Sequence, residues 1–124
     1  YAAVDTSQTT QSTSYIDLAT SGPAITVTTG TRALVIHGAN LGNNTLNGFA
    51  IMGITISGAS SVAAGDNKSL AFKSGVADQN MQACWTELYT TLTPGSNIFT
   101  AKYKTTNAAH TATFLRRHLT VIPF

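Results

Sequence analysis

Residues 93–105 read TPGSNIFTAKYKT, and this stretch decides the fold class. Pro94 and Gly95 occupy the two central positions of a four-residue turn, the arrangement of a type II turn. After the turn, side chains alternate in character, with Phe99 and Tyr103 on one side of the chain and lysines on the other. A period of two residues is typical of a strand with one buried face. The stretch therefore predicts a turn followed by a β-strand.

The rest of the chain repeats this arrangement of short alternating or apolar runs between turn residues. The predicted strands are Tyr15–Ala19, Ala24–Thr28, Arg32–Ala39, Phe49–Ser57, Leu70–Lys73, Gln82–Leu92, Asn97–Thr105 and Thr111–Ile122. About eight short strands at such spacing predict a single all-β domain over residues 15–124, an antiparallel β-sandwich or a barrel.

The segments between the strands are polar. Tyr1–Ser14 is rich in Thr, Ser and Gln without apolar period, so we expect an N-terminal arm that is loose or lies across a partner. Gly38–Gly48 and Ser74–Asn80 are predicted loops. Gly53 interrupts an apolar strand, which indicates a bulge or a close approach of other atoms to the backbone.

The composition fits one domain with an unusual surface. The chain has 124 residues, of which 43% are hydrophobic and only 10% are charged, against about 25% charged in an average globular domain. A surface of short hydroxyls and amides carries little charge repulsion and suits packing against copies of itself. The net charge of +2 is scattered, which argues against a nucleic-acid partner.

Cysteine count and hydropathy bear on the cellular compartment. Cys84 is the single cysteine, so no internal disulfide is possible and synthesis in a cytosol is expected. No stretch approaches the ~20 apolar residues of a membrane span, and no signal peptide is visible, so no membrane partner is predicted. The sequence starts at Tyr1 without Met, and we expect a chain that is processed, trimmed or part of something longer.

The sequence predicts no enzyme, no metal site and no cofactor. The three histidines are far apart and show no metal-ligand spacing, and the five acids are too few to favour a catalytic pair. No nucleophile elbow is present, and the glycines lie between strands, where no helix follows to bind a phosphate. Cys84 precedes Trp85 in a predicted strand, so we expect it to act as a small buried apolar residue.

The closing strand holds the most informative charges. With strict alternation, Leu115, Arg117 and Leu119 share one face, while Arg116 and His118 lie on the other face with Phe114. An arginine in an apolar row must be paired or must reach a partner. Two interpretations stay open, a contact across a subunit interface and an intrachain ion pair. The candidate acids for that pair are Asp17, Asp66 and Glu87.

Three segments resemble a small module that recurs in virion proteins of tailed bacteriophages. They are TSYIDLATSGPAITVTTGTRALVIHGANL (residues 13–41), LTPGSNIFTAKYK (92–104) and ATFLRRHLTVIP (112–123). The turn at residues 57–60 is also similar to a Ser-Gly-Ala-Thr turn of that module. The likeness covers about Thr13 to Phe124. Its motifs are turn and core signatures, so they indicate a fold better than a task.

The resemblance implies a jelly-roll sandwich that forms homotrimers on a virion and has no catalytic role. Arg117 matches the arginine of the module's closing motif, where it is structural, whereas Arg116 and His118 depart from the commoner pattern and their role stays open. The implied partners are further copies of the chain and the major capsid protein or another virion protein. Members of this kind are head decoration proteins, head fibres, or minor tail and tail-fibre proteins.

Two hypotheses follow for the function. The first is a capsid decoration or head-fibre protein that binds and stabilises the assembled capsid, with Tyr1–Ser14 touching the shell or a neighbour. The alternative is a tail-associated receptor-binding module, which would hold a host surface glycan with distal loops such as Gly38–Gly48 and Ser74–Asn80. A cellular lectin-like or adhesin module of similar fold is a weaker option.

Overall fold

Strands dominate the computed structural model, which describes all residues from 1 to 124. They are β1 (Ala2–Val4), β2 (Gln8–Thr10), β3 (Ala24–Thr29), β4 (Ala33–Asn43), β5 (Phe49–Gly58), β6 (Leu70–Lys73), β7 (Gln79–Tyr89), β8 (Gly95–Lys104) and β9 (Ala112–Pro123). One 3₁₀ turn, η1 (Asp66–Lys68), precedes β6. No helix has the length and apolar character needed to cross a membrane.

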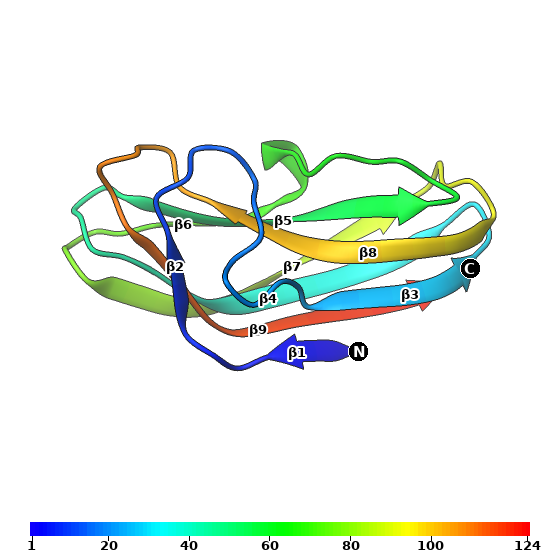
Figure 1. The fold of residues 1–124 in the computed structure, drawn as a ribbon, viewed down its shortest axis with the longest axis horizontal. Coiled ribbons are helices and arrows are strands. Elements are labelled where there is room, and N and C mark those ends of the chain that lie inside the picture. The colour runs from blue at the N-terminus through cyan, green and yellow to red at the C-terminus, as the bar shows by residue number, and fades with distance from the viewer.

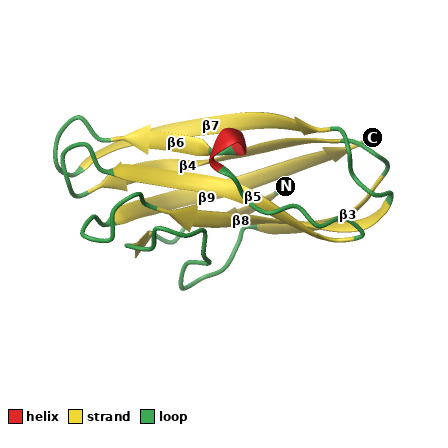
Figure 2. Ribbon diagram, turned by 90° about the horizontal axis from the view of Figure 1, so that it is seen from above, coloured by secondary structure: helices red, strands yellow, loops and turns green.

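The strands form two sheets packed face to face (Figure 1). Sheet A has the order β1-β9-β4-β7, with β2 also paired to β9, and sheet B has the order β3-β8-β5-β6. All pairings are antiparallel. Counting β1 and β2 as one interrupted strand gives eight strands in the jelly-roll arrangement, with the chain crossing repeatedly between the sheets. Figure 2 shows the two layers from above. The predicted β-sandwich is confirmed.

The core lies between the sheets and follows the alternation seen in the sequence. In β8, Phe99, Ala101 and Tyr103 point inward and have no exposed surface, whereas the lysines point outward. The ring of Phe99 contacts that of Tyr89 at 6.4 Å between centroids, and Tyr103 contacts Phe114 at 4.8 Å. Burying each large ring stabilises the fold by about 2–3 kcal/mol, so β8 holds the two sheets together.

The N-terminal segment differs from the predicted arm. β1 and β2 pair with β9 and supply the first strand position of the jelly roll, interrupted at residues 5–7. Without this segment, one edge of β9 would leave its backbone donors and acceptors unpaired. Only a few inward side chains contribute to the core, among them Gln8 and the buried Thr10. Residues 2–10 therefore form strand structure although their sequence shows no apolar period.

Two further segments depart from the predicted pattern. Tyr15–Ala19 is not a strand and makes only one bridge, between Ile16 and Tyr103. Gly38–Gly48 is a loop only after Asn43, because β4 runs on to that residue. In β4 the inward row up to Leu41 is apolar except for His37. The outward row beyond His37 has glycine and asparagine, which made a paired strand look like a loop.

A β-bulge lies in β9 beside β4. The two strands pair residue for residue on both sides of Ala39, but Arg116 and Arg117 together lie opposite this one residue. Arg116 takes up the extra length with a φ of 52°, in the left-handed region that few non-glycine residues adopt. A bulge of this kind shifts the alternation of side chains along its strand.

The bulge overturns the predicted faces of the closing strand. Phe114 and Arg117 were expected on opposite faces, but both lie in the core with no exposed surface. Leu115 was expected to share the face of Arg117, but it lies on the outer face, where it pairs with Asn40 and lines a hollow. Strict alternation fails here because the bulge inserts one extra residue into β9, so the side chains before and after it face opposite sides from those that the period predicts.

Candidate functional site

Arg117 is a buried structural residue. Its Nη1 donates to the carbonyl oxygens of Thr20 at 3.1 Å and Gly22 at 3.2 Å, and its Nη2 donates to Gln8 Oε1 at 2.9 Å. The guanidinium also lies over the ring of Tyr103, 5.2 Å from its centroid. Arg117 forms neither the ion pair nor the subunit contact considered from the sequence, because it has no acidic partner and no exposed surface; its internal hydrogen bonds fit the structural role that the resemblance implies.

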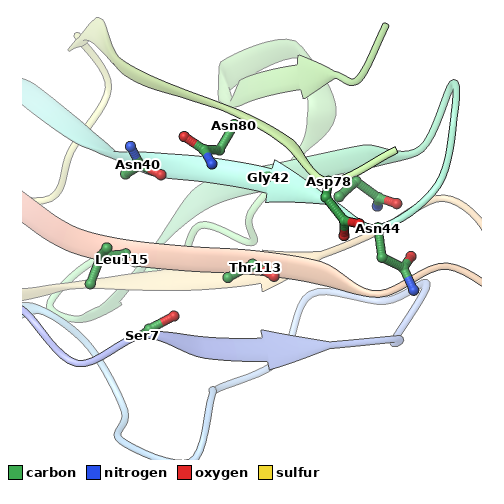
Figure 3. Close-up of a pocket in the computed structure, with 9 residues that line it drawn as sticks. Ser7, Asn40, Gly42, Asn44, Asp78, Asn80, Thr113 and Leu115 are labelled. Atoms are coloured by element: carbon green, nitrogen blue, oxygen red, sulfur yellow. The ribbon is translucent and has the colours of Figure 1, made fainter. Parts of the chain in front are cut away.

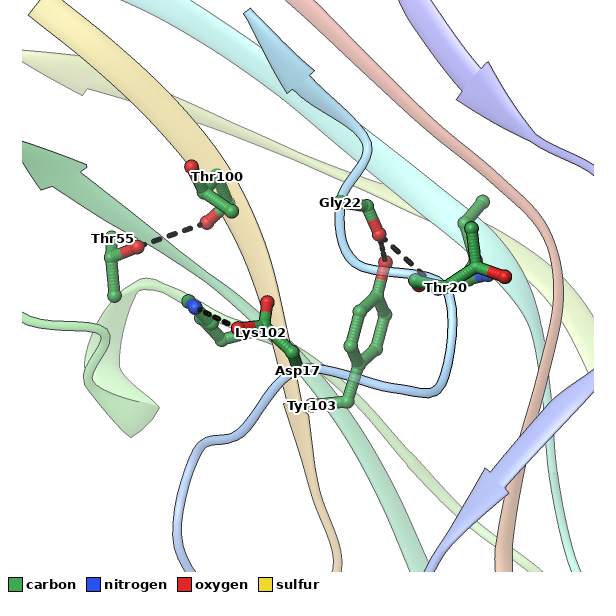
Figure 4. A network of polar contacts seen from close by, with 8 residues as sticks. Asp17, Thr20, Gly22, Thr55, Thr100, Lys102 and Tyr103 are labelled. Carbon is green, nitrogen blue, oxygen red and sulfur yellow. Dashed lines mark hydrogen bonds and ion pairs between the residues drawn. The ribbon is translucent and has the colours of Figure 1, made fainter.

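The acids expected beside the arginines pair with lysines instead. Asp17 accepts from Lys102 at 2.8 Å, Asp66 lies 2.8 Å from Lys104, and Glu87 lies 3.5 Å from Lys68. Figure 4 shows the Lys102–Asp17 pair and, apart from it, the Tyr103 hydroxyl, which donates to the carbonyl of Gly22 at 2.7 Å.

Two of these ion pairs lie on the outer face of sheet B. The hydrogen bond from Lys104, and then that from the hydroxyl of Tyr15, hold the pKa of Asp66 below its usual value. The ring of Tyr15 lies against Gly53, where a Cβ would come within 2.8 Å of it. This close approach confirms the prediction made from that glycine, and the chain itself thus covers part of this face.

The outer face of sheet A carries two adjoining hollows, and neither is covered by the chain. The first, the Asn-rich hollow, has a volume of about 240 Å³ and lies over the end of β4 (Figure 3). Its lining includes Ser7, Asn40, Asn44, Asp78, Asn80 and Thr113. Asparagine side chains and one carboxylate thus dominate its wall.

The structure brings together the two segments predicted as loops. Asp78 N donates to Asn43 O at 3.0 Å, and Ser74 N donates to Gly48 O at 2.9 Å. The buried amide of Asn43 fixes the turn below them, donating to Phe49 O at 2.9 Å and accepting from Thr45 N at 3.0 Å. This amide serves the fold, so its neighbours form the part of the hollow that is open to a ligand.

The second hollow, of about 540 Å³, contains two of the residues singled out from the sequence. Arg116 and His118 line it together with Tyr1, Asp5 and Gln82. The two hollows adjoin because Asn40 of the first pairs with Gln82 of the second across β4 and β7. Arg116 is exposed and forms no ion pair in this structure, so it is free to reach another molecule.

The other half of the same face is apolar. Leu34 on β4 lies opposite Leu88 on β7 and Ile122 on β9, and directly opposed residues point to the same side of a sheet. Leu88 is 47% exposed and Ile122 is 43% exposed. Phe124 lies with Leu88 in a third hollow at this end. These four residues form a continuous apolar patch.

The edge of β7 extends this patch around to the inner side of sheet A. Trp85 and Met81 point toward the inner side but remain 40% and 46% exposed. The short β6, with four residues against the eleven of β7, leaves them uncovered. β7 is also the last strand of its sheet, so one side of its backbone is unpaired. We call the Leu34, Leu88, Ile122 and Phe124 patch together with Met81 and Trp85 the β7 surface.

Cys84 contradicts the expectation of a buried apolar residue, because it is exposed. It lies opposite Gly38 on the outer row of the edge strand. Trp85 likewise lies outside the core, whereas Tyr89 and Tyr103 are buried. Sequence patterns missed this because β7 has the composition of an internal strand.

The histidines do not converge. No group of three or more His, Cys, Asp or Glu side chains is placed to hold a metal ion. His37 is fully buried between the sheets, where its Nε2 lies 3.2 Å from Met52 O. Burial lowers the pKa of His37 to about 4, so this ring stays neutral at physiological pH. His118 packs over Gly38 on the outer face, where a Cβ would meet its ring at 2.6 Å.

Comparison with known proteins gives no name to this arrangement. No protein-family model matches the chain, and no curated protein sequence matches it. A jelly roll hosts many unrelated functions, so the function must be argued from the two surfaces of sheet A, the polar hollows and the β7 surface.

Proposed function

We propose that this protein is a non-enzymatic structural component of a bacteriophage virion that self-associates, as a homotrimer, and binds the assembled capsid as a decoration or head-fibre protein. The motifs at residues 13–41, 92–104 and 112–123 supply the virion context. The β7 surface carries the proposal, because it is the part of the molecule that is least complete in a single chain.

The edge of β7 lacks the usual protection against pairing with another chain. Natural edge strands are blocked by proline, bulges, inward charges or a covering segment. β7 has eleven residues, no proline and one charged residue, Glu87, whose carboxylate is already paired with Lys68. A long edge without proline or a covering segment, whose one inward-pointing charge is paired within the chain, supports the view that another chain covers it.

The side chains on both sides of this edge support the same view. Exposed Trp and Met are the residue types enriched in protein interfaces, and Trp85 and Met81 lie on one side of the strand while Leu88 lies on the other. The best occupant is a second copy of the chain. The strand β7 carries no unpaired charge of its own, since Glu87 lies 3.5 Å from Lys68, and Arg32 lies in the hollow beside Leu88 and Phe124.

Self-association of this kind suits a protein on a particle. A ligand that binds only assembled shells stabilises them by mass action, and each added contact favours the assembled state. A trimer multiplies the contacts with the shell, so modest individual contacts combine into firm attachment. Synthesis in the host cytoplasm followed by residence in the virion is the corresponding location.

The first test is the oligomeric state. Light scattering after size exclusion should give three times the chain mass, and Trp85→Lys combined with Leu88→Lys should give a monomer with an unchanged far-UV spectrum. Ile98→Lys is the matched control, because Ile98 is an exposed apolar residue on sheet B, and it should remain trimeric. A wild-type chain that stays monomeric at high concentration would contradict self-association.

The second test is location and copy number. Electron microscopy of purified particles should show the protein on the capsid surface, in a copy number comparable to that of the major capsid protein. Only a few copies per particle, or density confined to the tail, would overturn the decoration function.

A second candidate function is favoured by one observation, the polar hollows on the outer face of sheet A. A tail-associated receptor-binding module would use such a site for a host surface glycan. Adsorption assays would separate the two functions, because a receptor-binding module in excess should block phage attachment to cells, whereas a decoration protein should not.

A further inference from the structure

The two hollows of sheet A lie side by side, because Asn40 of one pairs with Gln82 of the other, and we call the surface that they form together, from Asn44 to Arg116, the groove. We infer that this groove is a binding site for an uncharged oligosaccharide. The inference rests on the second candidate function, receptor binding, and adds the site and the chemical class of the ligand. It is independent of self-association through the β7 surface.

The groups that line the groove match the hydrogen-bonding needs of a sugar. A carboxamide offers both a donor and an acceptor, so it can bridge neighbouring hydroxyl groups, each of which also donates and accepts. Asn40 and Asn80 contribute carboxamides at the Asn-rich hollow, and Asp78 contributes a strong acceptor. Unlike Asn43, these three side chains form no hydrogen bond within the chain, so their donors and acceptors are available.

Apolar contacts complete the match. Leu115 lines the Asn-rich hollow and Ala3 lines the second one, and both can contact the C–H faces of sugar rings. Tyr1 is an exposed aromatic side chain at the far end, and aromatic rings suit contacts of mixed apolar and polar character. Ligand sites commonly combine such an apolar lining with a few placed polar groups.

The charge of the groove argues against an anionic ligand. The lining contains two carboxylates, from Asp5 and Asp78, and one guanidinium, from Arg116; His118 lies in the same hollow as Arg116. Recognition of phosphate or sulfate relies on clustered cations, and the carboxylate of Asp78 would repel such groups in the Asn-rich hollow. The hydroxyl groups of an uncharged saccharide can hydrogen-bond to the carboxylates and to the guanidinium alike.

The floor of the groove is held rigid by the fold. Gly42 leaves no side chain on the outer row, and a Cβ there would come within 3.1 Å of Asn80. Asp78 has a φ of 59°, and its N–H bond to Asn43 O fixes it at the rim. A preformed site loses less conformational freedom on binding, which matters for ligands that are held mainly by hydrogen bonds.

The groove and the apolar patch of Leu34, Leu88, Ile122 and Phe124 lie at opposite ends of the outer face of sheet A. Asn40, Asn80 and Asp78 are near the C-terminal end of β4, whereas Leu34 and Leu88 are near its start. Chains associated through the apolar end would leave the polar end open, so a trimer would present three grooves and gain avidity for a repeated glycan.

The test uses the full chain on an array of immobilised neutral and acidic oligosaccharides. We expect binding to neutral members only, followed in solution by ¹H–¹⁵N shift changes confined to residues 1–7, 40–44, 78–82 and 113–118 when the best neutral oligosaccharide is titrated. Binding only to acidic members, or shift changes elsewhere, would overturn the groove as a neutral glycan site.

Paired variants separate the groove from the wider function. Asn40→Ala with Asn80→Ala removes two hydrogen-bonding side chains and should weaken binding about tenfold or more. Asn67→Ala is the matched control, because Asn67 is exposed in η1 beside sheet B, and its affinity should not change. Binding that survives the double variant would overturn the groove but leave receptor binding standing. A wild-type trimer that binds no glycan on the array would remove both.

Discussion

The outer faces of the two sheets differ in what covers them. On sheet B, Tyr15 packs on Gly53, and Lys102 and Lys104 are paired with Asp17 and Asp66. On sheet A, the outer face has unpaired polar side chains at one end and an uncovered aliphatic row at the other. The chain covers and pairs side chains on the outside of one sheet and leaves the outside of the other uncovered.

This difference arises from the paths of the segments that connect the strands. The segment between β2 and β3 crosses from sheet A to sheet B and lies along the edge of β8, where Ile16 bridges to Tyr103. The loop before β6 folds over the outside of β5, where Ala64 lies beside Gly53. No connecting segment crosses the outside of sheet A, so its side chains meet solvent or a partner.

The largest expected effect comes from removing the link between the closing strand and the crossing segment. Arg117→Ala leaves the carbonyl of Thr20 without its donor, removes one of the two donors to the carbonyl of Gly22, and creates a cavity beside Tyr103. We expect a loss of about 3–5 kcal/mol in the free energy of unfolding, measured in urea. The neighbouring Arg116→Ala, at an exposed position, should change it by less than about 0.5 kcal/mol. Equal losses would contradict the assignment of the two arginines.

The next effect is a dependence on pH that originates inside sheet A. Burial lowers the pKa of His37 from 6.5 to about 4; Glu87 opposes this shift and His118 adds to it. Between these values the unfolded chain binds the proton more readily, so stability falls as pH decreases from about 6.5 to about 4. The total loss in the free energy of unfolding is about 3 kcal/mol. Above about pH 6.5 His37 causes no loss.

Chemical denaturation across the pH range measures this slope. His37→Gln keeps a neutral amide that can donate to Met52 O and should flatten the stability profile between pH 6.5 and 4. The same slope in the variant would show that another group causes it.

A smaller effect tests the uncovered apolar row. Leu88→Thr with Ile122→Thr gives the outer face of sheet A the hydroxyl character of sheet B, and should lower the stability of a single chain by only about 1 kcal/mol, because both side chains are largely exposed. The melting temperature of the wild type should rise with protein concentration, and that of the variant should not. Ile98→Thr on sheet B should keep the wild-type dependence.

The smallest effect concerns the outer face of sheet B, where the charged side chains are paired within the chain. Asp66→Asn removes the exposed pair with Lys104 and should cost about 0.5 kcal/mol, since exposed ion pairs contribute little. Because the pKa of Asp66 is lowered in the folded state, its contribution is present above the normal carboxyl pKa and is lost as pH falls through the lower value. Asp78→Asn, on the uncovered face, should leave urea unfolding unchanged. An equal loss in both variants would contradict the contrast between the faces.

Local patterns predicted most strands because each depends on neighbours in sequence. Ala24–Thr28 and Asn97–Thr105 match β3 and β8 to within a few residues, since alternation reports directly which side chains face the core. The β1–β2 segment was missed because a strand that completes an edge needs few apolar residues. Its pairing is set by the free backbone of β9, which no local pattern shows.

The candidate site was harder to predict than the fold. Arg116, Arg117 and His118 are consecutive, yet the bulge sends Arg117 into the core and leaves the other two in a hollow. The predicted loops at residues 38–48 and 74–80 do meet, but the groove also needs Ser7 and Thr113 from distant parts of the chain. The polar composition of the groove's lining could be read from the sequence, whereas the meeting of those residues in space could not.

The sequence by itself determined an all-β sandwich, because the two-residue period and the turn residues act within a few positions of each other. It also determined the low charge of the surface. Only the tertiary structure decided which strand lies at an edge, which outer face stays uncovered and which of two adjacent arginines is buried. Those properties depend on strand order and on one inserted residue opposite Ala39, and both are set by pairing between segments far apart in the chain.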